Sequence, residues 1–532
     1  MLRRLSSDPL RYSCNVTSND RIVRSLLYSS ANIYTEYLLG LIVSIVIARS
    51  LGPADFGVYA LIVWVCALSI TVINAGISVA AIKFTSELSG RGQTAVLPLI
   101  QRYLARIQLV KGFIFLTIFG LIALLAPGIL VEEGQRILLW MVIPVVLFKS
   151  FHMFQVGIIK GHQEFRALAR IAFIVAPLNI LFVTVAYLTS PTIFGYLVAF
   201  VLTSIVYFLA SNSSLKMIKV VGDGSSRTKI DEDLKARINK LLKYTSLIII
   251  LAYVVYGQSE LLFLKHLGNA SDLAFFSVGF VLARSASALV PGVYNNILLP
   301  RISYAVGKDD QTAASALMSA SRHMLFLGLL CAVPIAVFAE DIVLFLYGEE
   351  YRAAYIPTMI FAIVAVLGGV RDTTNAYLVS VDAQPMILKI VAALFCGTII
   401  LDFFLIAEYG LLGGVVAYAV MEVIATAAIS FFAYQRLGRW PEVNKVAKAL
   451  AAAALSAGVA YSIGAALSFT GGFIIGAAVS PVAFIIGLFL FDAFDDDDYK
   501  IIQPLVSGRS DLFCKVVDST VRRRLATSSR SL

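Results

Sequence analysis

Length, composition and charge place this chain among membrane proteins. It has 532 residues, of which 59% are hydrophobic and 14% are charged. Soluble domains carry about 25% charged residues, so the composition excludes an ordinary soluble protein. The formal net charge of +10 is not evidence for nucleic-acid binding, because the basic residues are concentrated in alternate loops between apolar segments. We therefore expect a polytopic membrane protein with no nucleic-acid partner.

About fourteen apolar segments are long enough to cross a membrane. A helix needs about 20 apolar residues to span a hydrocarbon core of about 30 Å. The segments exceed the roughly 10 residues of a barrel strand and do not alternate, so an all-α fold of about 14 transmembrane helices is expected. Their approximate limits are 27–48, 58–79, 104–126, 137–159, 168–188, 192–211, 244–264, 274–296, 318–339, 355–378, 387–407, 411–433, 447–467 and 472–492.

Most basic residues lie in the loops on one side of the predicted helices. Clusters of arginine or lysine precede the first span and follow several even-numbered spans, whereas Glu132, Glu340 and Glu349 lie in the opposite loops. Such basic enrichment is typical of cytoplasmic loops, and it would also attract anionic lipid headgroups. We expect a multi-pass protein of the cell membrane, with the basic N-terminus (1–25) and the tail (495–532) both cytoplasmic.

A tight turn separates the first two spans. It has the sequence GPADFG, and we interpret Gly52, Pro53, Asp55 and Gly57 as a structural turn motif. Glycine can adopt a positive φ, proline fixes its own φ and lacks an N–H group, and aspartate can cap the following helix. A related turn, LGNASD at 267–272, follows about 217 residues later. Use of the same turn twice predicts two copies of one helical bundle.

Other pairs of similar segments share this offset, for example KF…GQTA at 83–95 and RI…DQTA at 301–313. Each copy contains an even number of spans, so both copies enter the membrane from the same side, as in a parallel repeat. The sequence therefore predicts two pseudo-symmetric six-helix lobes plus two C-terminal helices. The predicted parts are the N-terminus 1–25, an N-lobe 26–214, a cytoplasmic linker 215–243, a C-lobe 244–434, two further helices within 435–494, and the tail 495–532.

Charged residues within the predicted spans are the first functional candidates, because ionisable groups at bilayer depth are costly. Lys149 lies near the middle of the fourth span, Arg284 near the middle of the eighth, and Arg371 with Asp372 in the tenth. In one interpretation the cations face a water-filled cleft between the lobes and bind an anionic group of a substrate. In the other interpretation the charges pair within the protein. Asp402 and Glu422 are interpreted as groups that form hydrogen bonds between helices.

Motifs for catalysis and metal binding are not evident. The four histidines and five cysteines are dispersed, without the spacing of a metal site or a disulfide framework. Neither a phosphate-binding glycine loop followed by lysine nor a serine nucleophile elbow is present. We therefore predict a transporter rather than an enzyme, with no catalytic residue, metal or cofactor.

Four segments together carry a family resemblance. They are ARSLGPADFGVY at 48–59, KGHQEF at 160–165, LYGEEY at 346–351 and YGLLGGVVA at 409–417. With these segments the chain resembles the polysaccharide-biosynthesis membrane proteins, the Wzx-type O-antigen flippase branch of the MATE-like MOP superfamily. The resemblance covers about residues 25–495, which is nearly the whole chain.

The resemblance implies two lobes around a central cavity, with the first and seventh spans on its walls, and alternating access by rocking of the lobes. It implies a polyprenyl-diphosphate-linked oligosaccharide as cargo, moved to the outer leaflet for export of O-antigen, capsule or exopolysaccharide. A cationic cavity would bind the diphosphate, and Lys149 and Arg284 are the candidates. Coupling to an H⁺ or Na⁺ gradient, or to the membrane potential, would need a carboxylate, for which Glu36, Glu260 and Asp372 are candidates.

Other functions stay open from the sequence. An ion-coupled multidrug exporter of the same superfamily would need an acidic rather than a cationic cavity. A membrane-embedded glycan polymerase or ligase would need a large outward loop, and the outward loops here are short. The chain could also act as a noncatalytic partner of glycosyltransferases or of a polymerase in the same pathway.

Overall fold

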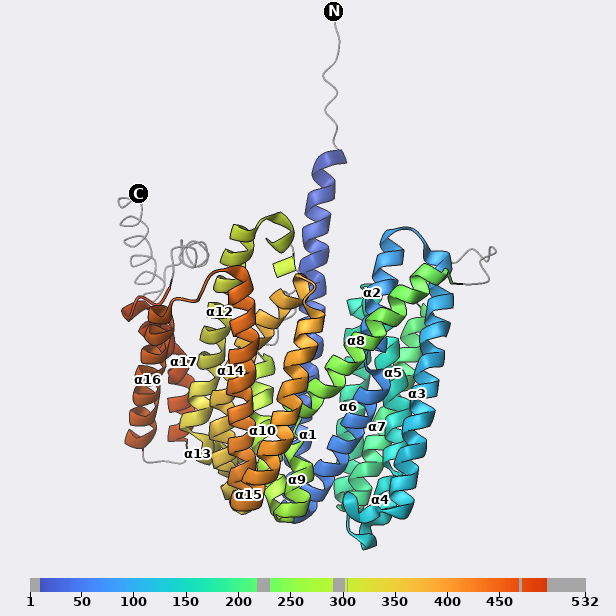
Figure 1. The fold of residues 1–532 in the computed structure, drawn as a ribbon. Coiled ribbons are helices and arrows are strands. Elements are labelled where there is room, and N and C mark those ends of the chain that lie inside the picture. The colour runs from blue at the N-terminus through green and yellow to red at the C-terminus, as the bar shows by residue number, and fades with distance from the viewer. Residues whose placement is uncertain (1–9, 218–229, 290–301, 304, 468–470, 495–532) are drawn as a thin grey trace, which may run out of the picture. The chain divides into compact units, whose positions relative to one another are not determined.

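The computed structural model describes residues 10–217, 230–289, 302–303, 305–467 and 471–494, apart from the side chains of 10–33, Glu36 and Glu133. The predicted tail, the first nine residues of the predicted N-terminus and the centre of the predicted linker therefore lie outside the described residues. Every regular element in the described part of the chain is helical (Figure 1). The elements are α1 (Leu10–Asn74), α2 (Ile77–Gly90), η1 (Thr94–Val96), α3 (Leu97–Leu125), η2 (Pro127–Ile129), η3 (Glu133–Gln135), α4 (Arg136–Trp140), α5 (Val142–Gly161), α6 (Phe165–Thr189), α7 (Ile193–Met217), α8 (Glu232–Tyr256), α9 (Glu260–Leu267), α10 (Ala270–Leu289), α12 (Asp310–Val337), α13 (Ala339–Tyr347), η4 (Glu349–Ala354), α14 (Tyr355–Ser380), α15 (Gln384–Leu437), α16 (Val443–Ala466) and α17 (Gly472–Leu490).

Among the described residues, 11 helical segments are long and apolar enough to cross a membrane. Two of them, Tyr37–Asn74 and Gln384–Leu437, each contain a non-helical residue, at Gly52 and Gly410 respectively. When these two are divided at their glycines and α10 is added, each of the roughly fourteen predicted spans has a helical counterpart. The prediction of an all-α polytopic membrane protein is confirmed.

The predicted second span, 58–79, extends past the end of the helix that forms it. Helix α1 ends at Asn74, and α2 begins at Ile77 after Gly76, which has a φ of 76°. A Cβ atom on Gly76 would lie 2.7 Å from Ser246 Oγ, so the turn also permits the close approach of α8. The sequence pattern missed this break because the residues around it are small or apolar and continue the hydrophobic run.

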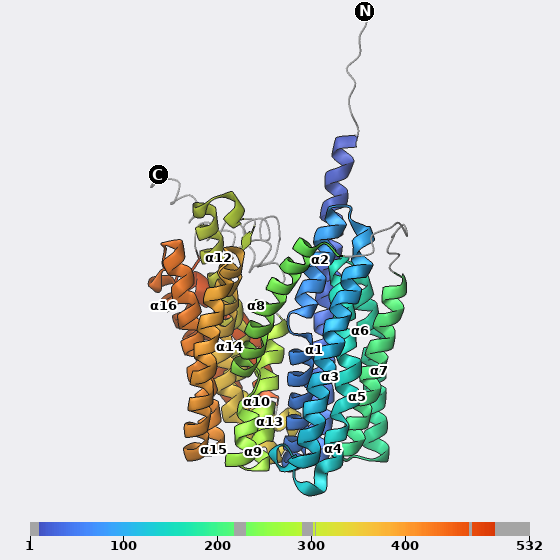
Figure 2. The same ribbon diagram turned by 45° about the vertical axis from the view of Figure 1, so that its right-hand side comes forward.

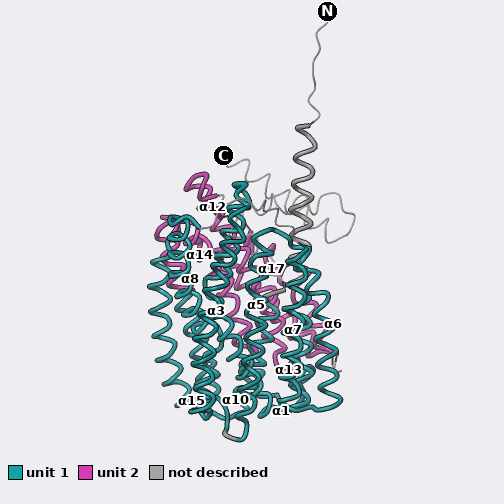
Figure 3. The backbone as a smooth tube through the Cα atoms, turned by 90° about the vertical axis from the view of Figure 1, so that its right-hand side faces the viewer, with its two compact units in different colours: residues 1–289, 343–357, 383–425 teal, residues 290–342, 358–382, 426–532 magenta. Residues whose placement is uncertain are grey.

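The described chain forms two compact units, which Figure 3 shows in different colours. Unit 1 contains residues 1–289, 343–357 and 383–425, and unit 2 contains residues 290–342, 358–382 and 426–532. Unit 1 thus joins α1 to α10 with the corner at 343–357 and most of α15. The lobe boundaries that the repeat predicts stay a prediction.

Within unit 1, α2, α3, α5, α6 and α7 run side by side (Figures 1 and 2). Small residues on α5 let α2 approach closely: a Cβ atom on Gly157 would lie 3.1 Å from the carbonyl oxygen of Ser78, and one on Gly161 would lie 2.6 Å from Thr85 Cβ. The Ser86 hydroxyl donates a hydrogen bond of 2.8 Å to the carbonyl oxygen of Gly161. Close packing at small residues is the usual way in which membrane helices associate.

The second half of the predicted linker is helical and packs against the N-terminal helices of unit 1. Helix α8 begins at Glu232, and its Ile238 and Leu242 are buried in one apolar cluster with residues of α2 and α3. An ion pair joins the same elements, since Arg237 Nη2 lies 2.9 Å from Glu87 Oε1 at the end of α2. Asn239 accepts a hydrogen bond of 2.7 Å from the Tyr103 hydroxyl of α3.

We expect Glu87→Gln to lower the stability of this contact at neutral pH only. The hydrogen bond from Arg237 is the main cause of a lowered Glu87 pKa, and the Arg91 charge lowers the pKa further. A lowered folded-state pKa means that the pair stabilises the fold above the ordinary glutamate pKa of 4.5 and that this contribution is lost as pH falls through the lowered pKa. Since the pair is partly exposed, the difference should be about 0.2–1 kcal/mol. Thermal unfolding in detergent at pH 7 and at acidic pH measures it, and an equal difference at both pH values would contradict the assignment.

In unit 2, α12, α16 and α17 pack around a shared apolar cluster. The Ser456 hydroxyl of α16 donates a hydrogen bond of 2.7 Å to the carbonyl oxygen of Ser480 in α17. A Cβ atom on Gly476 would lie 2.7 Å from the carbonyl oxygen of Ala460, and one on Gly487 would lie 3.0 Å from Ala452 Cβ. The alanine and glycine residues of these two helices therefore serve close helix packing.

Candidate functional site

The GPADFG turn divides α1 into two helical segments. Gly52 has a φ of 74° and a ψ of 170°, a backbone conformation that glycine adopts without strain, and Pro53 follows it directly. Asp55 is exposed near the start of the second segment, and its predicted capping role stays a prediction. Gly57 is buried, and a Cβ atom on it would overlap the carbonyl oxygen of Ala270. Glycine at this position therefore lets the start of α10 cross α1 at very short range.

The second copy of the turn lies at this crossing. The Asp272 side chain accepts a hydrogen bond of 3.0 Å from the backbone N–H of Asn269, the residue before α10. This is one half of a capping box, in which an acidic residue in the first turn of a helix binds the N–H group of the capping residue. The two turns that the sequence identified as related thus meet in unit 1, through Gly57 and Ala270.

A short polar break interrupts the predicted seventh span between α8 and α9. Gln258 has a φ of 66°, which is uncommon for a residue other than glycine. The Trp64 indole N–H of α1 donates a hydrogen bond to the carbonyl oxygen of Gly257, and the Ser277 hydroxyl of α10 donates one of 3.4 Å to Gln258 Oε1. The break is therefore held by side chains from two neighbouring helices, and irregular backbone at membrane depth occurs where it is buried in protein or lines a cavity.

Two carboxyl groups come together directly after this break. Glu260, the first residue of α9, is 1% exposed, and Asp402 of α15 is fully buried. The two residues are neighbours in the fold, because Ser259, the residue before Glu260, contacts Asp402 directly. The Ser259 hydroxyl donates a hydrogen bond of 3.3 Å to Asp402 Oδ2. Glu260 was a predicted coupling carboxylate, whereas Asp402 was interpreted only as an interhelical hydrogen-bonding group.

Three buried oxygen atoms around this pair have no hydrogen-bond partner in the described structure: Glu260 Oε2, Asp402 Oδ1 and Thr398 Oγ1. Thr398 is 1% exposed and lies one turn before Asp402 on the same face of α15. Buried polar atoms are nearly always paired, because an unpaired one costs free energy. A set of carboxylate and hydroxyl oxygens is the chemistry that a proton or a hard cation such as Na⁺ would satisfy.

Lys149 lies on α5 and contacts the neighbouring helix α7. Its Nζ atom lies 3.2 Å from the centre of the Tyr207 ring, a cation–π geometry. The His152 ring lies 4.6 Å from the same ring, and His152 Nδ1 is hydrogen-bonded to Ser211 Oγ at 2.6 Å. Lys149 therefore belongs to a polar group between α5 and α7, and its predicted role in substrate binding stays a prediction.

Arg284 lies on α10 and is exposed. Its guanidinium carbon lies 5.9 Å from the centre of the Phe280 ring, one turn earlier on the same helix. Its binding of an anionic substrate group likewise stays a prediction.

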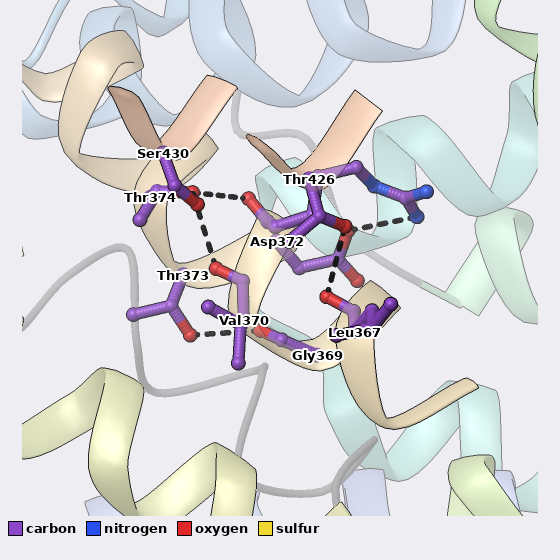
Figure 4. A network of polar contacts seen from close by, with 9 residues as sticks. Leu367, Gly369, Val370, Asp372, Thr373, Thr374, Thr426 and Ser430 are labelled. Atoms are coloured by element: carbon purple, nitrogen blue, oxygen red, sulfur yellow. Dashed lines mark hydrogen bonds and ion pairs between the residues drawn. The ribbon is translucent and has the colours of Figure 1, made fainter. Parts of the chain in front are cut away.

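Arg371 and Asp372 lie on α14 in unit 2. Arg371 Nη2 lies 3.4 Å from Asp372 Oδ1, so the two residues form an ion pair within the protein. Hydroxyl groups around them also form hydrogen bonds, as Figure 4 shows: Thr374 contacts Ser430 of α15 at 3.3 Å, and Thr426 donates to a carbonyl oxygen of α14 at 3.3 Å. A role for Arg371 in substrate binding, or for Asp372 in coupling, stays a prediction.

Sequence reasoning missed two residues of the site, Thr398 and Ser259, and named Asp402 only as an interhelical hydrogen-bonding group. These residues become a group only when the start of α9 meets α15. The side chain of the remaining candidate, Glu36, lies outside the described residues. A signal was available in the polar Gly257–Ser259 interruption of an apolar span, since such interruptions mark binding sites in transporters.

Comparisons with known proteins give both a family and a fold. The sequence profile described as "Polysaccharide biosynthesis protein" matches residues 22–306, more than half of the chain. No curated protein matches the sequence.

Three solved structures resemble the fold at 15% identity each. One is a lipid II flippase, MurJ, in an inward closed conformation, with a TM-score of 0.68 over 87% of this chain and 98% of that chain. The second is an inward-facing multidrug resistance MATE family transporter of the MOP superfamily, with a TM-score of 0.64 over 75% of this chain and 94% of that one. The third, a MOP superfamily transporter from Pyrococcus furiosus, has a TM-score of 0.61 over 79% and 95%.

Proposed function

The chain belongs to the polysaccharide biosynthesis protein family, and from this premise we propose that it is a flippase for lipid-linked oligosaccharides. Its cargo would be a polyprenyl-diphosphate-linked glycan unit, which it moves from the cytoplasmic to the outer leaflet of the cell membrane. The exported unit would then enter a surface polysaccharide such as O-antigen, capsule or exopolysaccharide.

The observation that carries this proposal is the combination of family and fold. The family is described by polysaccharide biosynthesis. The fold of this chain is similar to that of a lipid II flippase over 98% of the flippase chain. A lipid-linked precursor with a diphosphate is the substrate class that joins these two findings. The distribution of basic loops supports an orientation with both termini in the cytoplasm, which puts the Gly52 turn at the outward side.

Lys149 and Arg284 are the groups that we propose for diphosphate binding. Both lie within membrane helices of unit 1, and each already contacts an aromatic ring. Charge-assisted hydrogen bonds from lysine or arginine to phosphate are strong in a site of low dielectric constant. The glycan would cross together with the diphosphate while the polyprenyl chain stays in lipid.

We propose that the pair Glu260 and Asp402 binds the coupling cation, H⁺ or Na⁺. The support is the set of unpartnered oxygens that Glu260, Asp402 and Thr398 bury beside the break in the seventh span. A cation that binds one conformation more tightly than the other shifts the balance between them, and it can do so only through such differential contacts. The membrane potential would act on the same charge.

Depletion of the protein in its host tests the flippase proposal. We expect loss of surface glycan and accumulation of lipid-linked glycan that only reagents on the cytoplasmic side can reach. Restored export on expression of the wild-type chain is the control. Accumulation of glycan units on the outer leaflet would instead indicate a polymerase or ligase, and normal surface glycan with raised sensitivity to toxic compounds would indicate a drug exporter.

A further inference from the structure

The corner between α13 and α14 packs deeply into unit 1. Tyr351, in the short helix η4, is only 1% exposed. Its hydroxyl donates a hydrogen bond of 2.7 Å to the carbonyl oxygen of Ala48, a residue 303 positions earlier in the chain. Ala48 lies one turn before Gly52, where the first helical segment of α1 ends.

Aromatic rings from three elements surround Tyr351. Phe56, just after the turn of α1, meets it edge-on at 6.2 Å between ring centres, and Phe275 of α10 does so at 6.3 Å. Tyr347, at the end of α13, lies at 5.7 Å. Edge-to-face pairs at these distances are favourable beyond the area that they bury. Tyr351 is therefore inserted between the two related turns rather than resting on their surface.

Two further contacts stabilise the packing of the corner, residues 343–357, against α1. Arg49 Nη2 donates a hydrogen bond of 2.6 Å to the carbonyl oxygen of Phe345. The Glu350 carboxylate lies beside the turn, where a Cβ atom on Gly52 would come within 3.6 Å of it. The corner thus touches α1 before the turn, at the turn and after it, and it touches α10 as well.

We propose that Tyr351 acts as a lock, by which we mean a residue that keeps the outward end of the transport route closed. It holds the first turn of α10 against the turn of α1, and this end opens when the Tyr351 hydroxyl leaves Ala48 and the ring leaves its position between Phe56 and Phe275. The proposal rests on the proposed function, because that function assigns this end to the outer side. The free energy of a few such contacts is of the size that separates the conformations of a transporter.

Cysteine labelling tests the lock without any cargo. The reporter is Ala274→Cys in a chain whose five native cysteines are replaced by serine. Ala274 is fully buried and lies one turn after Ala270, on the face of α10 that meets α1. A membrane-impermeant maleimide added to intact cells should reach this position only when the outward end opens.

Tyr351→Phe should label about fivefold faster than the reporter alone, because it loses a hydrogen bond of about 1 kcal/mol but keeps the ring. Tyr351→Ala should label faster still. Tyr461→Phe is the matched control, because that tyrosine is 66% exposed, and it should label at the rate of the reporter alone.

A second variant opens the same end from the opposite side. Gly57→Ala places a methyl group against the carbonyl oxygen of Ala270 and should also increase labelling. Unchanged labelling in both the Tyr351 and the Gly57 variants, in protein that elutes as a single species in detergent, overturns the lock. Labelling only from the cytoplasmic side overturns it too. Neither result bears on glycan export after depletion, which tests the flippase proposal by itself.

Discussion

Glycan export is expected to stop when Lys149 and Arg284 are both replaced by glutamate. Each cation would lose charge-assisted hydrogen bonds worth about 1.5–3 kcal/mol, and together these correspond to a fall of at least about a hundredfold in rate. The two new carboxylates would also repel the diphosphate. Surface glycan and lipid-linked intermediates, measured in cells that express the variant as the only copy, give the result.

The charge-conserving variant Lys149→Arg with Arg284→Lys is the matched control and should retain much of the export. Lys149 also stabilises the fold through the Tyr207 ring, so protein level and thermal stability must be measured beside export. The milder change Lys149→Gln separates the two effects, since it removes the charge without placing a carboxylate beside the ring. Normal surface glycan in the double glutamate variant would remove both residues from the transport route.

The second large effect is expected at the buried carboxyl pair. Glu260→Gln and Asp402→Asn keep the shape of each side chain but remove its ability to bind a proton or Na⁺. We expect each change to weaken the dependence of export on the cation gradient by about tenfold or more, since a charged ligand contributes about 1.5–3 kcal/mol. Stability should not fall, because neutralising a buried, incompletely paired carboxylate is often neutral or favourable.

Transport by the purified protein in proteoliposomes, with either a pH gradient or a Na⁺ gradient, distinguishes the two cations. Glu422→Gln is the control, because Glu422 is 3% exposed on the same helix α15 and is not part of the pair. It should keep the response to the gradient. If Glu260→Gln and Asp402→Asn respond to both gradients as the wild type does, the pair does not couple transport to a cation.

The local pattern of the sequence determined the helical framework. Long apolar runs form helices in a membrane, because the helix is the conformation in which a single segment pairs all of its own backbone polar groups. Glycine and proline predicted the break at Gly52 because their backbone preferences are local properties. The break at Gly76 was not predicted, because glycine is needed there for a contact with a distant helix, the close approach of Ser246. A local pattern does not show such a contact.

The candidate site was decided by tertiary structure. Lone carboxyl groups in separate spans carry no information about which of them meet, and Ser259 and Asp402, which join the site, are 143 positions apart in the chain. The role that we propose for Tyr351 likewise depends on its hydrogen bond to Ala48, which is 303 positions away in the chain. By itself the sequence established the apolar helical segments and the break at Gly52, because these follow from contacts within a few residues. Packing between distant helices decided which charges are paired, which oxygens lack partners and which ring closes an end, because burial and pairing depend on neighbours that no local pattern specifies.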